Sequence, residues 1–320
     1  MIRKVVREMN MNQSRMKGIF LVLLGAILWG VSGTVAQYLF EQQAFNAEWL
    51  TVIRLLSAGV LLLLFARRRQ NIWAIWQRRG NRISVVLFGI FGMLAVQYTY
   101  FAAIAASNAA TATLLQYTGP VMIALYLLIR FKTWPSMQQV VAIILALLGT
   151  FLLVTHGQFT SLSISGWALF WGLASAVALA FYTLQPIKLL NEFGSAVVVG
   201  WGMVIGGIGM SVVHQPWNVV GNLNPLSIAA LLFVVLFGTL IAFYSYLESL
   251  KYLKPTETSL LACAEPLSAA VLAVVWLNVS FGGAEWLGAS CIIATIVILS
   301  RVKEKKSHGL GESQVKEEVG

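Results

Sequence analysis

Residues 88–124 read FGIFGMLAVQYTYFAAIAASNAATATLLQYTGPVMIA, and residues 234–270 read VVLFGTLIAFYSYLESLKYLKPTETSLLACAEPLSAA. The second stretch lies 146 positions after the first, and the two align without a gap at nine identical positions out of 37. Matches of Leu or Ala arise by chance in an apolar chain. The shared Phe-Gly, Tyr-x-Tyr and Pro stand in one register and therefore indicate an internal repeat.

The composition around this repeat is that of a membrane protein. Hydrophobic residues make up 58% of the 320 residues and charged residues 11%, and Asp is absent. A soluble domain is about a quarter charged. Ten apolar stretches are each long enough to cross a bilayer, and the need to satisfy backbone hydrogen bonds in lipid makes them helices. We place the spans at residues 18–40, 49–66, 83–105, 107–130, 137–155, 164–186, 195–213, 227–249, 255–277 and 284–301.

The positive charges predict the orientation of these spans. Every Lys and Arg except Arg54 lies in a segment that can face one side of the membrane, and cytoplasmic loops retain such cations during insertion. The opposite loops carry no Lys or Arg. We therefore expect a multi-pass protein of the cell inner (plasma) membrane with both termini cytoplasmic. The first apolar run is read as a retained span, because it lacks a signal-peptide cleavage site.

The repeat and the spans together predict an all-α polytopic membrane protein. Its ten transmembrane helices form two inverted five-helix repeats, because five spans per copy make the second copy enter from the opposite side. The expected divisions are a cytoplasmic segment at 1–17, repeats at 18–155 and 164–301, and a disordered cytoplasmic tail at 302–320.

Several short sequence motifs indicate a resemblance to one protein family. They are Ser107-Asn-Ala-Ala-Thr-Ala-Thr113, Thr155-His-Gly157, Ser161-Leu-Ser-Ile-Ser165, Phe170-Trp-Gly172 and Cys263-Ala-Glu-Pro-Leu-Ser268. With them the chain resembles the EamA family of the drug/metabolite transporter (DMT) superfamily, most of all its YicL-type branch of carboxylate, amino acid and amine transporters. The resemblance covers about residues 15–301 and implies a substrate among amino acids, carboxylates, amines or drug-like compounds. At the end of the fourth span Arg130-Phe-Lys132 stands where the family often has a Glu.

Glu265 is the first candidate for function. It lies about ten residues into the ninth span, roughly 15 Å deep, and an intramembrane carboxylate is costly enough to suggest a role. Pro266 follows it, and Pro120 holds the equivalent position in the first repeat, so both are expected to bend their helices. Such bends at matched positions often mark a transporter site. The alternative is a protonated Glu that only holds the bend.

Arg54 is the cation expected inside a span, about 9 Å from the outer surface. It could bind a substrate carboxylate or pair with Glu265 in the empty site. Alternatively, it reaches outward and bonds loop carbonyls.

Further candidates are aromatic or polar. The symmetric tyrosines are Tyr98, Tyr100, Tyr244 and Tyr246, of which one per pair can face a cavity; Tyr98 and Tyr244 are chosen here, with interhelical packing as the equal alternative. Other polar candidates for substrate binding or coupling are Asn108, Gln116, Tyr117 and Gln185.

An enzyme is not expected. Gly30-Val-Ser-Gly33 matches the short string of intramembrane serine proteases, but small residues that let helices approach explain it better. A Walker loop and metal-protease motif are absent, so no cofactor or metal is expected. The charge of +10 follows from topology, so lipid headgroups are expected and nucleic acid is not.

The resulting prediction is a secondary transporter that exports or exchanges a small organic metabolite by alternating access. Coupling to protons through Glu265 and uncoupled facilitation both remain open, as does the oligomeric state. The alternative is a non-transporting membrane protein, an intramembrane enzyme or sensor, on the same scaffold.

Overall fold

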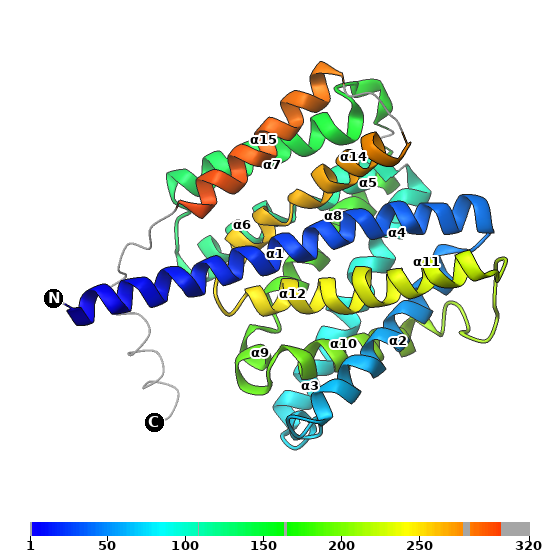
Figure 1. Ribbon diagram of the computed structural model, residues 1–320, viewed down its shortest axis with the longest axis horizontal. Coiled ribbons are helices and arrows are strands. Elements are labelled where there is room, and N and C mark those ends of the chain that lie inside the picture. Colours follow the sequence, from blue (N-terminus) through cyan, green and yellow to red (C-terminus); the bar gives the residue numbers. More distant parts are fainter. Residues whose placement is uncertain (1, 108, 163–164, 278–281, 302–320) are drawn as a thin grey trace.

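The computed structural model describes residues 2–107, 109–162, 165–277 and 282–301. Over these ranges the chain forms helices and turns, with no strand (Figure 1). The α-helices are α1 (Ile2–Gln43), α2 (Ala47–Arg67), α3 (Arg79–Leu87), α4 (Ala95–Ala106), α5 (Ala109–Gln116), α6 (Gly119–Phe131), α7 (Met137–Thr155), α8 (Gly166–Leu184), α9 (Ile187–Phe193), α10 (Ser195–Met210), α11 (Pro225–Val235), α12 (Ala242–Ser249), α13 (Pro255–Leu261), α14 (Ala264–Leu277) and α15 (Gly283–Ser300). Shorter elements are the 3₁₀ turns η1 (Ala74–Trp76) and η3 (Phe159–Ser161) and the π-helical turns η2 (Phe88–Leu94) and η4 (Leu236–Ile241).

Eight helical stretches of the described chain are long and apolar enough to cross a membrane. They are Gln13–Gln43, Ala47–Arg67, Arg79–Ala106, Thr111–Phe131, Met137–Thr155, Gly166–Phe193, Pro225–Ser249 and Gly283–Ser300. Two of the ten predicted spans fall outside this group. The helix α10 is apolar but has only 16 residues, and the span predicted at 255–277 is divided into α13 and α14. The chain is thus an all-helical, multi-pass membrane protein.

The largest difference from the predicted boundaries is at the N-terminus. The helix α1 begins at Ile2 and has 42 residues, whereas the span was predicted to begin at residue 18. Lys and Arg are good helix formers, so the helix extends through the basic residues that precede the apolar run. Elsewhere α2, α7 and α15 begin and end within a few residues of the predicted spans.

The helices pack with an internal symmetry. The helix α2 packs on α10 and α7 packs on α15, and each of these pairs joins segments 146 positions apart. Likewise α1 packs on α12 while its counterpart α8 packs on α4, the counterpart of α12. The first span of each repeat therefore contacts the third span of the other (Figure 1).

Glycines set the closest of these contacts. A Cβ placed on Gly149 of α7 would lie 2.9 Å from the carbonyl oxygen of Gly288 on α15. A Cβ on Gly206 of α10 would lie 3.1 Å from the carbonyl oxygen of Gly89 in η2. The pair Gly202 and Gly206 thus serves helix packing within this chain.

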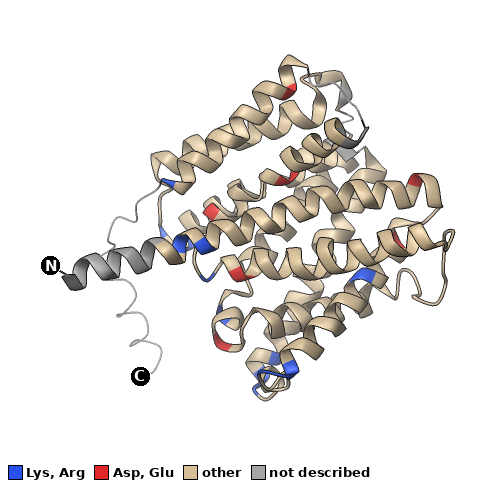
Figure 2. Ribbon diagram, in the orientation of Figure 1, with Lys and Arg blue, Asp and Glu red and all other residues tan. Residues whose placement is uncertain are grey.

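The π-helical turns occupy matched positions in the two repeats. The turn η2 interrupts the third predicted span and η4 the eighth, and their residue ranges overlap when shifted by 146. Figure 2 shows Lys and Arg around the loop between α2 and α3 and on α1 just after its grey part, while the middle of the bundle carries few charges.

Candidate functional site

Two helices are interrupted at repeat-equivalent positions. The first break, at residues 117–118, separates α5 from α6, and the second, at residues 262–263, separates α13 from α14. Pro120 is the second residue of α6, and Pro266 is the third residue of α14. Proline has no backbone N–H, and its ring clashes with the carbonyl four residues earlier, so each helix can restart at the proline but cannot continue through it.

The two breaks face each other. The hydroxyl of Tyr117, which lies in the first break, donates to Oε2 of Glu265 at 2.8 Å. The same hydroxyl lies 3.4 Å from the carbonyl oxygen of Ala262, which also accepts from the backbone N–H of Glu265 at 2.9 Å because Pro266 has no N–H to donate. Tyr117 is buried and Glu265 is partly buried. The gap in each helix therefore supplies groups that bond across the boundary between the repeats.

The carboxyl of Glu265 has hydrogen-bonding capacity that its bond with Tyr117 does not use. No other side chain among the described residues bonds it, and the residue is not fully buried. A carboxylate accepts up to about four hydrogen bonds. The site can therefore accept a hydrogen-bond donor or a cation from a ligand.

The helix α1 packs against the backbone of α14 at Glu265. A Cβ placed on Gly30 would lie 2.5 Å from the carbonyl oxygen of Glu265 and 2.9 Å from the backbone nitrogen of Ala269. Ser268 donates its hydroxyl to the carbonyl oxygen of Glu265 at 2.8 Å. The glycine at the start of the Gly30–Gly33 string thus lets α1 touch the backbone of α14.

Arg54 has a neutral partner. Its guanidinium donates to Oε1 of Gln97 on α4, and Gln97 in turn donates to the carbonyl oxygen of Met93 at 3.2 Å. Nε of Arg54 is buried without a hydrogen bond, and none of the ion pairs between described residues includes this arginine. The structure therefore holds a positive charge inside the bundle with no carboxylate bonded to it.

The remaining candidates lie in separate places. Gln116 donates to the hydroxyl of Ser175 at 2.8 Å, and Gln185 donates to Ser84. Tyr98 is exposed beside Trp171, and Tyr244 is partly buried. Asn108 lies outside the described residues. The structure thus brings Tyr117 together with Glu265, and it leaves Tyr98 and Gln185 bonded or packed elsewhere.

Three polar groups that were not chosen as site residues make hydrogen bonds inside the bundle. Gln97 is 5% exposed and was not singled out, although an amide in an apolar run was a signal for it. The hydroxyl of Tyr100 bonds that of Thr113 at 2.7 Å. The hydroxyl of Tyr246 bonds that of Thr183 at 2.9 Å. Tyr100 and Tyr246 therefore make interhelical hydrogen bonds, whereas Tyr98 and Tyr244 were the tyrosines predicted to face a cavity.

A partly buried ion pair lies at the start of α13. Arg15 Nη1 is 3.0 Å from Oε2 of Glu257, and Arg15 Nη2 donates to the carbonyl oxygen of Leu299 at 2.7 Å. The Glu257 side chain is 2% exposed. Because Arg15 is on α1 and Leu299 on α15, this pair ties three helices together at one end of the bundle.

Comparison with known proteins agrees with this architecture. Residues 16–155 and 166–301 each match the EamA-like transporter family. The uncharacterized inner membrane transporter YicL of Salmonella typhimurium is 41% identical over 288 residues, which are 90% of this chain and 96% of that protein. The threonine/homoserine exporter RhtA of Escherichia coli is 25% identical over 284 residues, which are 86% of this chain and 88% of that protein.

A solved crystal structure shares the fold. It superimposes with a TM-score of 0.75 at 17% sequence identity, and the match covers 89% of this chain and 96% of that one. The resemblance drawn from the sequence is confirmed, and we conclude that the chain belongs to the EamA-like transporter family.

Proposed function

We propose that this protein is a secondary transporter that exports or exchanges a small organic metabolite by alternating access. The observation that carries the proposal is the hydrogen bond between Tyr117 and Glu265, which joins two interrupted helices from the two repeats. A half-helix can tilt without moving the whole span, so each break provides a hinge beside the site. Interrupted helices at a repeat interface are the usual setting of a transporter binding site.

The membrane arrangement that we propose has ten spans. The helix α10 and the pair α13–α14 complete two sets of five. Since five is odd, the second set enters the bilayer in the opposite direction. Ten spans in all place both termini on the same side of the membrane, which we propose is the cytoplasm. The clustering of Lys and Arg supports this orientation, and the name of the relative YicL supports the inner membrane as the location.

The substrate that we propose carries both an amino and a carboxylate group. Glu265 offers an acceptor to the amino group, and Arg54 offers a charge to the carboxylate. A buried charge bonded to a neutral amide is not compensated, so Arg54 gains from a carboxylate ligand. The name of RhtA, a threonine/homoserine exporter, supports an amino acid. Glu265 is also our candidate for carrying a coupling proton.

The test is flux through purified protein in proteoliposomes, with labelled amino acids, amines and carboxylates offered separately. Glu265→Gln should lower flux of the best substrate about tenfold or more, because a hydrogen bond to a charged group is worth about 1.5–3 kcal/mol. Glu192→Gln is the control, since that carboxylate is at an exposed ion pair with Arg78. Equal flux in the Glu265→Gln variant and the wild type, with both proteins folded, would remove Glu265 from the mechanism.

A further inference from the structure

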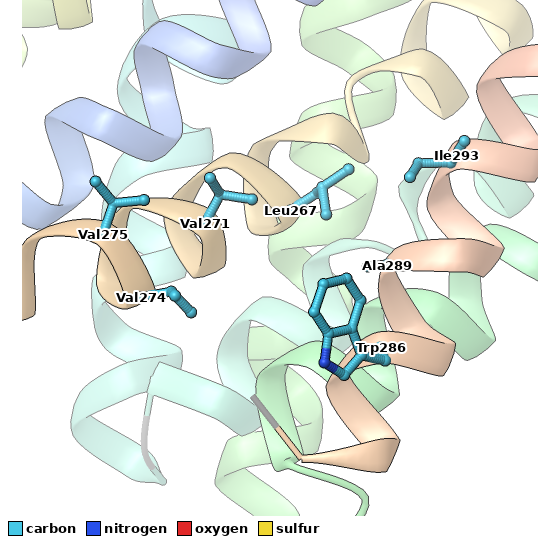
Figure 3. A pocket seen from close by; sticks show the side chains of 7 residues that line it. All are labelled: Leu267, Val271, Val274, Val275, Trp286, Ala289 and Ile293. Carbon is cyan, nitrogen blue, oxygen red and sulfur yellow. The ribbon is translucent and has the colours of Figure 1, made fainter. Parts of the chain in front are cut away.

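An apolar groove lies between α14 and α15. Its volume is about 540 Å³, and its lining residues are Leu267, Val271, Val274 and Val275 on α14 and Trp286, Ala289 and Ile293 on α15 (Figure 3). Ala289 is 5% exposed and forms part of the floor, whereas Val275 and Trp286 are 74% and 64% exposed on the rim. The groove is therefore open along its length and nearly free of polar groups.

The groove exists because its two helices are held by different neighbours. Gly30 lets α1 touch the backbone of α14 at Glu265 and Ala269, on a face of α14 that differs from the one lining the groove. Gly149 and Gly288 hold α15 against α7, on the face of α15 opposite to Trp286 and Ile293. Each helix therefore packs on a different neighbour, and the groove remains between α14 and α15.

The composition of its two helices places the groove in the apolar layer of a membrane. Both helices are apolar, and α15 is one of the stretches long enough to cross the membrane. From Trp286 to Ile293 the groove runs for about 10 Å, and one leaflet of the hydrocarbon core is about 15 Å thick. If the groove were empty, its lining side chains would lack dispersion contacts on one side.

A second copy of this chain does not suit the groove. Helices associate in membranes through small residues that let the backbones approach. The rim instead carries bulky side chains, with Val271 49%, Ile293 52% and Trp286 64% exposed. A thin flexible chain can follow such a rim, whereas a helix cannot approach its floor.

We propose that this groove binds one acyl chain of a membrane phospholipid. The bound chain would lie against α14 from Leu267, the residue after Pro266, to Val275 near the end of that helix. The indole of Trp286, which lies in the first turn of α15, would then sit close to the headgroup layer that Trp prefers. The site does not depend on the proposed transport activity.

The experiment uses the full-length protein in vesicles of phosphatidylglycerol and phosphatidylethanolamine. A fraction of the phosphatidylglycerol carries a photoactivatable group in the middle of its acyl chain. After illumination, mass spectrometry of peptides counts the adducts. We expect several-fold more adducts on α14 and α15 than on the exposed apolar surface of α2, and Val271→Trp should reduce them several-fold by filling the groove.

The matched control is Val60→Trp on α2, because Val60 is 48% exposed and lies outside the groove. It should leave the adducts on α14 and α15 unchanged. If Val271→Trp fails to fold, Val275→Trp at the rim replaces it. Equal labelling of α2 and the groove, adducts unaffected by both tryptophans, or crosslinks between two copies of the chain at these residues would each overturn the proposal.

Discussion

Tyr117 and Glu265 contact each other through a single hydroxyl, which makes their bond simple to test. Tyr117→Phe keeps the ring that fills the break and removes only the donor at 2.8 Å from Glu265. We expect flux of the best substrate to fall about tenfold, because a hydrogen bond to a charged group is worth about 1.5–3 kcal/mol. Tyr38→Phe is the control, since among the described residues its hydroxyl is bonded by Gln43 of the same helix. If both variants transport equally well, the bond has no part in transport.

Arg54 and Gln97 form a second pair that can be separated by substitution. Gln97→Leu leaves the buried guanidinium without its acceptor. We expect a loss of about 1–3 kcal/mol of stability, seen as a lower midpoint of thermal unfolding in detergent. The double variant Arg54→Met, Gln97→Leu should recover most of this loss, because removing both partners leaves no unsatisfied charge. Additive losses in the double variant would show that the pair does not interact.

At the scale of the helix, Pro266 controls the break between α13 and α14. Pro266→Ala supplies a backbone N–H four residues after the carbonyl of Ala262, which now accepts from the N–H of Glu265, and it removes the ring that blocks a continuous helix. We expect the variant to be at least as stable as the wild type and to transport more slowly, because a continuous helix removes the hinge. Pro225→Ala at the start of α11 is the control. A less stable variant, or one that transports at the wild-type rate, contradicts this role.

The ion pair of Arg15 and Glu257 ties α13 to α1 and α15. If α13 moves during transport, this pair must open. Glu257→Gln weakens it, and we expect the buried thiol of Cys263 to react several-fold faster with a membrane-impermeant reagent added from the cytoplasmic side. The labelling is done in a Cys291→Ser background. Glu248→Gln, which loses a pair with Lys251 at 2.9 Å, is the matched control and should leave the rate unchanged; no difference between the two variants would argue against this gate.

The sequence predicted the boundaries of the helices better than the contacts between side chains. Apolar length placed α2, α7 and α15 to within a few residues, and the matched prolines pointed to the region of both breaks. The predicted span at 195–213 begins with α10 and ends a few residues after it, because the apolar run continues past Met210 while the helix gives way to turns. The bond from Arg54 to Gln97 was missed because it joins residues 43 positions apart, and such a pairing depends on how α2 and α4 pack.

At the scale of the whole molecule, the proposed topology can be tested with reporter fusions. Activity-based reporters at the C-terminus and between Lys251 and Lys254 should report the cytoplasm. A reporter inserted near residue 220, in the turn before α11, should report the opposite side. These expectations follow from where Lys and Arg gather. Chain ends found on opposite sides of the membrane would refute the inverted arrangement.

The wide turns η2 and η4 have a consequence for the history of the chain. A π-helical turn arises from one extra residue in an α-helix, and an insertion in only one copy would shift every later position of that copy by one. The two copies instead match without a gap from residue 88 to residue 124 and from residue 234 to residue 270. Matched turns in one register are what a duplication of a segment that already held the extra residue would leave.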